Sequence, residues 1–149
     1  MRKIYVCSFL CLVFSISYAQ VKSNKVATVE INKTVIPFID KLQNNEQFTL
    51  HYSSKGCFHD VKESMTFQKE QDAYYVICQK ERKKLDATTL EAIRIFEKEL
   101  SAQQNNGLCT TVDHYLLIYN KSQRIISDGS CSWHGYSILK QKLGFRQYS

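Results

Sequence analysis

The chain has 149 residues, of which 44% are hydrophobic, and its formal net charge at pH 7 is +6. This length is enough for one compact domain with its own core, and nothing in it requires a second domain. A charge this small does not predict a nucleic-acid ligand, because solubility explains a mildly basic balance equally well.

The N-terminal segment predicts a cleavable export signal. Arg2 and Lys3 precede an uncharged, mostly apolar run that extends to Ile16, and small residues follow at the positions that a signal peptidase reads before a cut after Ala19. A membrane anchor is the rival interpretation, but an anchor needs about 20 consecutive apolar residues and this run is shorter. We therefore expect a secreted or periplasmic protein.

Cleavage at this site would leave residues 20–149 as a single α+β domain. The two basic residues of the signal would leave with it, so the formal charge would fall from +6 to +4. No later stretch approaches the length of a membrane span. The expected organisation is a signal peptide at residues 1–19 and one domain, without a transmembrane segment, at residues 20–149.

This domain is predicted to open with a helix and a strand. The helix begins at Thr34, which can cap it, and ends before Asn44, and its apolar residues fall on one stripe. Residues 47–53 alternate between apolar and polar side chains, which is typical of a half-buried strand.

A hairpin and a charged segment come next. Residues 64–69 and 73–78 are rich in aromatic and β-branched residues on either side of a short polar turn, so they predict two paired strands. Residues 80–84 carry four basic side chains and one acid. We interpret them as a solvated connector rather than a nucleic-acid site.

The clearest helix of the chain is predicted to begin near Asp86 or Thr88 and to end before Asn105. Its apolar residues recur at helical spacing, with charged residues on the opposite side. Thr88 and Glu91 have the spacing of a capping box. One face of this helix is therefore expected to belong to the core.

Two more strands and a closing helix follow. Residues 112–119 are apolar on both sides except at Asp113 and His114, which favours a strand in the middle of a covered sheet. Residues 124–127 are predicted to return as its partner, and residues 136–143 as a helix that ends at Gly144 in a left-handed cap. The order α-β-β-β-α-β-β-α predicts an α+β fold, with helices packed on one face of an antiparallel sheet of about five strands.

Four cysteines remain after the expected cleavage, and they are Cys57, Cys78, Cys109 and Cys131. In an oxidising compartment an even number favours two disulfides, and four cysteines allow three pairings. We favour Cys57–Cys78 and Cys109–Cys131, each closing a loop of about twenty residues that is worth roughly 3 kcal/mol in the chain-entropy model. Buried free thiols are the alternative.

Two clusters bring a cysteine, an aromatic residue and a histidine close together, and they are Cys57-Phe58-His59-Asp60 and Cys131-Ser132-Trp133-His134. A bridge between Cys57 and Cys131 would bring His59 and His134 near each other, with Asp60 available to a transition metal. If reduced, the same residues offer two sulfur and two nitrogen ligands, which zinc prefers. Their spacings match no established zinc pattern, so we expect no metal and no other cofactor.

Catalysis is another use for these clusters. A nucleophile needs a base within hydrogen-bonding reach and usually a third, orienting group. The available residues are Cys57 or Cys131, with His59, His114 or His134 and Asp113 or Asp128. The sequence contains no nucleophile elbow, no paired-histidine metalloprotease motif and no glycine-rich phosphate loop. Alternation along a strand also points Asp113 and His114 to opposite faces, so these two neighbours cannot form a local dyad.

The favoured hypothesis is a small exported, soluble and non-enzymatic domain that binds a protein, a peptide or an envelope component. Aromatic residues suit a recognition surface, because they supply contact area at modest entropic cost. The residues predicted to form that surface are His59, Asp60, Trp133, His134 and Tyr136. The alternative is a small exported hydrolase or metal-binding protein that uses the two cysteine-histidine clusters.

Overall fold

The computed structural model of the chain describes residues 35–58, 60–103 and 107–146. All of them belong to the unit from Lys33 to Ser149, and it alone is described here. The predicted export signal and His59 lie outside the described residues. None of the helices in the described ranges has the length and apolarity that crossing a bilayer requires.

In this part of the chain, six strands form one antiparallel sheet in the order β4-β3-β2-β1-β5-β6. The strands are β1 (Gln47–Lys55), β2 (Asp60–Glu70), β3 (Ala73–Cys78), β4 (Glu81–Leu85), β5 (Val112–Tyr119) and β6 (Ser122–Asp128). The helices are α1 (Phe38–Lys41), α2 (Ala87–Ala102) and α3 (Gly135–Lys142).

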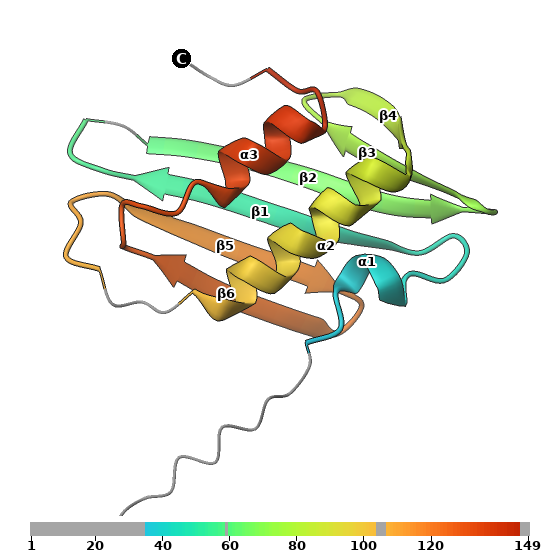
Figure 1. Cartoon of the computed structure of the whole chain (residues 1–149), viewed down its shortest axis with the longest axis horizontal. Coiled ribbons are helices and arrows are strands. Elements are labelled where there is room, and N and C mark those ends of the chain that lie inside the picture. The colour runs from blue at the N-terminus through green and yellow to red at the C-terminus, as the bar shows by residue number, and fades with distance from the viewer. Residues whose placement is uncertain (1–34, 59, 104–106, 147–149) are drawn as a thin grey trace, which may run out of the picture. The chain divides into compact units, whose positions relative to one another are not determined.

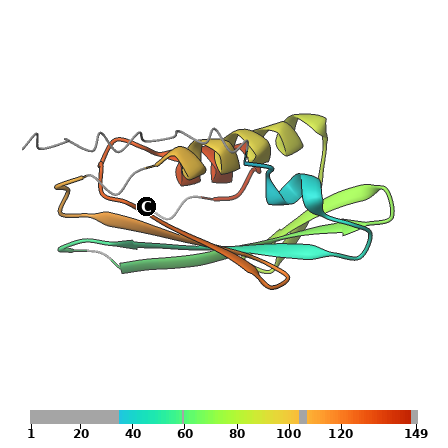
Figure 2. The ribbon, with the colours of Figure 1, turned by 90° about the horizontal axis from the view of Figure 1, so that it is seen from below.

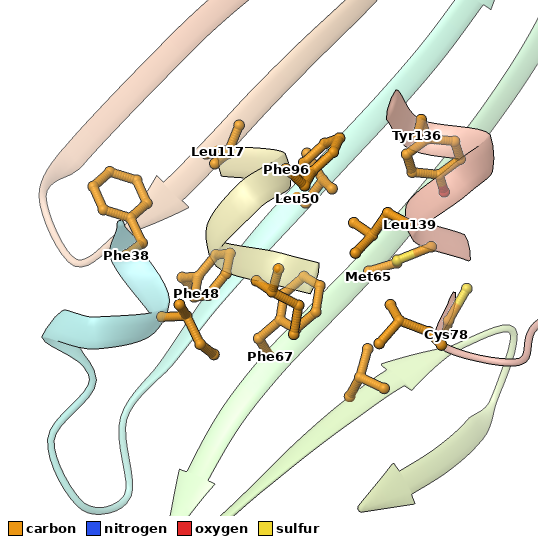
Figure 3. Packing of buried hydrophobic residues seen from close by; sticks show 14 of the residues in the cluster. Phe38, Phe48, Leu50, Met65, Phe67, Cys78, Phe96, Leu117, Tyr136 and Leu139 are labelled. Atoms are coloured by element: carbon orange, nitrogen blue, oxygen red, sulfur yellow. The ribbon is translucent and has the colours of Figure 1, made fainter. Parts of the chain in front are cut away.

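The three helices lie on one face of the sheet (Figures 1 and 2). Side chains on that face alternate along each strand with side chains on the open face, so Phe48 and Leu50 of β1 are buried while His51 is exposed. Figure 3 shows the resulting core between helices and sheet. In it, Phe67 stacks on Phe48 with ring centroids 4.7 Å apart. This arrangement confirms the predicted α+β class, with six strands in place of about five.

The additional strand is β4, which the sequence presented as a charged connector. Its side chains are mostly exposed, and only Leu85 is buried. A sheet edge tolerates such charge, and charge there also discourages pairing with another chain. Arg82 lies 3.8 Å from the ring centroid of Tyr75 and 2.6 Å from a carboxylate oxygen of Glu70. The basic run is therefore bound to the neighbouring strands and is not a free connector.

The helices differ from prediction mainly at their N-termini. The first is only four residues long, because the extended backbone of Pro37 directly precedes it. In α2 the capping box is formed by Asp86 and Thr89 rather than by the predicted pair. The backbone and side-chain hydrogen bonds from Thr89 lower the pKa of Asp86. At the end of α3, Gly144 adopts a left-handed φ of 71°, as predicted.

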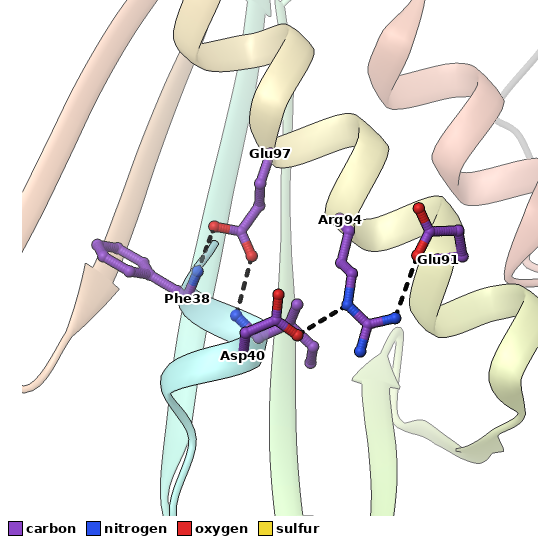
Figure 4. A network of polar contacts seen from close by, with 6 residues as sticks. Phe38, Asp40, Glu91, Arg94 and Glu97 are labelled. Carbon is purple, nitrogen blue, oxygen red and sulfur yellow. Dashed lines mark hydrogen bonds and ion pairs between the residues drawn. The ribbon is translucent and has the colours of Figure 1, made fainter. Parts of the chain in front are cut away.

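One buried carboxylate joins α1 to α2 (Figure 4). The side chain of Glu97 accepts the backbone N–H groups of Phe38 at 2.6 Å and Ile39 at 3.0 Å, and it lies 3.8 Å from Arg124 of β6. Since a four-residue helix cannot satisfy its own first N–H groups, Glu97 serves as its N-terminal cap.

A second buried polar group fixes α3 to the sheet. Lys140 donates to Glu63 of β2 at 2.6 Å, and the Tyr136 hydroxyl donates to the other oxygen of that carboxylate at 2.6 Å. The side chains of Lys140 and Glu63 are 3% and 5% exposed. These contacts set the position of the first turn of α3, which lines a pocket at one end of the sheet.

Candidate functional site

A pocket of about 290 Å³ lies at the end of the sheet where β5 begins and β6 ends. We call it the sheet-end pocket. Its walls come from β1, β5, β6, the segment that precedes α3 and the first turn of α3. The side chains that determine its chemistry are Tyr52, Asp113, Tyr115, Asp128, Trp133 and His134.

Two carboxylates face each other across the floor of this pocket. Asp113 of β5 and Asp128 of β6 are direct partners in the antiparallel register, on the face that the helices cover. Directly opposed residues of neighbouring strands have Cβ atoms only about 4.5–5.5 Å apart. Asp128 is 4% exposed, and its Oδ1 accepts the backbone N–H of Ser130 at 2.9 Å. The floor of the pocket therefore carries two adjacent acids.

Tyrosine hydroxyls point at one of these acids. Asp113 Oδ2 accepts hydrogen bonds from Tyr52 at 3.3 Å and from Tyr115 at 3.4 Å. Burial raises the pKa of Tyr52 to about 12, and it also raises the pKa of Tyr115 and of Tyr136. These phenols thus remain protonated at neutral pH and act as hydrogen-bond donors rather than charges.

Aromatic rings form one wall of the pocket. Trp133 stacks on Phe96 of α2 with ring centroids 5.6 Å apart. Trp133 and Tyr115 form a T-shaped pair with ring centroids 5.4 Å apart. Its indole N–H donates to Glu99 at 3.3 Å. Tyr52 and Tyr136 stack on each other at 3.8 Å. Because each ring is packed against another, this wall is formed before any ligand arrives.

A disulfide joins the loop that bears Trp133 to the segment before β5. It links Cys109 to Cys131, as predicted, and Cys131 has a left-handed φ of 58°. Closing a loop of this length stabilises the fold by roughly 3 kcal/mol in the chain-entropy model. The bridge therefore restrains a loop that lines the sheet-end pocket.

The second predicted disulfide, Cys57–Cys78, is absent, and both residues are free thiols. Cys78 is buried opposite Met65 of β2, whereas Cys57 is exposed beyond the pair Lys55–Asp60 at the end of the β1–β2 hairpin. Met65 and Asp60 are five residues apart, which corresponds to about 16 Å along a strand. A disulfide needs Cα atoms within about 7 Å of each other, and the separation along the strand exceeds this limit.

Three of the predicted binding residues lie together at the sheet-end pocket, and another lies away from it. Trp133, His134 and Tyr136 all line the sheet-end pocket. Trp133 is partly buried, His134 is exposed and Tyr136 is 4% exposed. Asp60 is exposed at the start of β2, 3.9 Å from Lys62, and is not among the lining residues. The remaining predicted residue, His59, lies outside the described residues.

The alternative chemistry of the two clusters receives no support from the described residues. Cys131 bonds to Cys109, so the bridge to Cys57 that would have brought the clusters together is not formed. No group of three His, Cys, Asp or Glu side chains within the described ranges is arranged to hold a metal ion. His114 faces away from Asp113, as predicted, and its Nδ1 lies 2.8 Å from Ser127 Oγ.

Sequence reasoning missed the pairing of the two acids and the role of Tyr52. Asp113 and Asp128 appeared only as possible orienting groups for a nucleophile, since their opposition depends on the strand register. The alternation of residues 47–53 placed Tyr52 on the apolar face, but nothing local indicated that its hydroxyl meets an acid. No family model, curated protein or solved structure matches this chain.

Proposed function

We propose that this chain is an exported, non-enzymatic binding domain that recognises a protein, a peptide or an envelope component through the sheet-end pocket. The observation that carries the proposal is the pocket itself, in which opposed acids, phenol donors and an aromatic wall converge. Ligand sites typically combine apolar walls with a few placed polar groups.

The size of the pocket favours part of a larger ligand. Pockets for drug-sized molecules are usually about 300–1,000 Å³. At about 290 Å³ the sheet-end pocket lies just below that range, so it suits one side chain or one head group. The rest of such a ligand would lie on the surface beside the pocket, where His134 and Ser137 are exposed.

A peptide-display selection against residues 20–149 tests the proposal. The Ser137→Phe substitution changes an exposed residue of α3 that lines the pocket, so it should fill the pocket and abolish binding of the enriched peptides. The matched control is Ile138→Phe, because Ile138 is also exposed on α3 but does not line the pocket. Enriched peptides that bind the Ser137→Phe and Ile138→Phe variants equally well would contradict the proposal.

The proposed export predicts the N-terminus and the cysteine oxidation state of the mature chain. The chain recovered from outside the cytoplasm should begin at Gln20 and contain one disulfide and two thiols that react with an alkylating agent, Cys57 and Cys78. Intact-mass measurement after alkylation under denaturing conditions, with and without prior reduction, checks both points. A chain that begins at Met1 would contradict cleavage of the predicted signal, and one with four alkylated cysteines before reduction would contradict an oxidising compartment.

A further inference from the structure

The charge of the sheet-end pocket is opposite to that of the whole chain. The sequence has 20 basic and 14 acidic residues, yet the described residues that line the pocket include two acids and no lysine or arginine. The acids are Asp113 and Asp128, and in the described part of the chain neither forms an ion pair with a basic side chain.

Two basic side chains on neighbouring elements are engaged by other acids. Arg124 lies on β6 together with Asp128 but sits against the buried Glu97, at 3.8 Å. Lys140 of α3 donates to Glu63 at 2.6 Å. Asp128 is 4% exposed, and an ion pair in a site that excludes water is stronger than one in open solvent. A cation that enters the pocket could form such a pair.

The aromatic wall adds a second preference for a cation. A cation is attracted to the face of a Trp or Tyr ring, and Trp attracts it most strongly. A planar guanidinium can stack on such a ring while it donates two parallel hydrogen bonds to a carboxylate. Trp133 and Tyr52 line the sheet-end pocket beside its two acids, and one face of each ring is stacked on another ring, Phe96 for Trp133 and Tyr136 for Tyr52.

We infer that the sheet-end pocket binds a cationic side chain of a peptide or protein, and that arginine fits it best. This inference rests on the proposed function, because it specifies the ligand class of the same site. The guanidinium would pair with Asp113 and Asp128 in the pocket that Trp133 also lines. The phenol donors of Tyr52 and Tyr115 already hold Asp113 in place for this contact.

The test uses the intrinsic fluorescence of Trp133, which is the only tryptophan of the chain and lines the pocket. The probes are N-acetyl-arginine amide and N-acetyl-citrulline amide, which share a shape and differ in charge. The arginine probe should give a saturable fluorescence change, and the citrulline probe should bind at least about tenfold more weakly.

Two variants and a control locate the interaction. Asp113→Asn and Asp128→Asn keep an acceptor oxygen and remove one charge each, so each should weaken arginine binding at least about tenfold. Asp60→Asn removes the same charge from an exposed residue outside the pocket and should leave binding unchanged. Thermal unfolding of each variant shows that the fold is retained.

The outcomes separate this inference from the proposed function. Equal binding of the arginine and citrulline probes, with both excluded by Ser137→Phe, would overturn the inference and leave a binding pocket. Absence of any fluorescence change with the arginine probe would also overturn the inference. The proposed function would then depend on whether the display selection yields peptides, without basic residues, that require the open pocket.

Discussion

Replacing Lys140 with methionine should lower the free energy of unfolding by about 3–5 kcal/mol, because it leaves the buried Glu63 carboxylate without its cation. The two side chains are 3% and 5% exposed and 2.6 Å apart. Tyr136 would remain as a hydrogen-bond donor to Glu63, but a neutral hydroxyl does not replace a charge. Urea unfolding of the variant and of the parent chain measures the difference.

The design includes a control and a compensating variant. Lys142→Met changes an exposed lysine of the same helix and should cost less than about 0.5 kcal/mol. The double variant Glu63→Gln, Lys140→Met removes both charges and keeps an acceptor for Tyr136, so it should recover part of the loss. A Lys140→Met effect no larger than that of Lys142→Met would show that the pair does not stabilise the fold.

Replacing Glu97 with alanine should cost roughly 2–6 kcal/mol, because two buried N–H groups lose their acceptor at about 1–3 kcal/mol each. The groups are those of Phe38 and Ile39, and Arg124 also loses its counter-charge. The exposed neighbour Lys98 provides the control, Lys98→Ala. Hydrogen exchange should show α1 opening in the Glu97→Ala variant before the sheet does, and protection of α1 equal to that of the parent would contradict its role as a cap.

The same residue gives the fold a pH dependence. Burial raises the pKa of Glu97, and its two N–H bonds and Arg124 offset only part of this shift. The folded chain therefore holds this proton more tightly than the unfolded chain, in which the carboxyl has its ordinary pKa of 4.5. Its stability contribution, measured against Glu97→Gln, should be full below pH 4.5 and should fall as pH rises through the raised pKa. A difference that grows with pH would contradict this assignment.

The elements that the sequence predicted well are those in which burial follows a local period. The strand at β5 and the helix at α2 each have a strong apolar pattern, and both lie where that pattern indicates. The sequence pattern did not predict the short β4, because this strand buries only Leu85 and pairs through its backbone. The N-terminal cap of α1 is Glu97, which lies 58 residues after Ile39 in the sequence, so no local pattern could reveal it.

The candidate site was predictable only in part. The cluster around Trp133 and His134 stood out from the sequence, and both residues line the sheet-end pocket. The floor of the pocket depends on the register that opposes Asp113 to Asp128, which the strands determine only when they pair. The sequence predicted Tyr136 as a binding residue in a short helix. Its ring is buried, and it stacks on the ring of Tyr52 with centroids 3.8 Å apart.

We propose that ligands bind at the sheet end, under the helices, and not on the open face of the sheet. Amide NMR spectra of residues 20–149 during titration with a peptide from the display selection test it directly. The largest shift changes should occur at the indole N–H of Trp133 and at the amides of Asp113 and Ser130. Changes centred on Leu116 and Ile125, which lie on the open face, would contradict it.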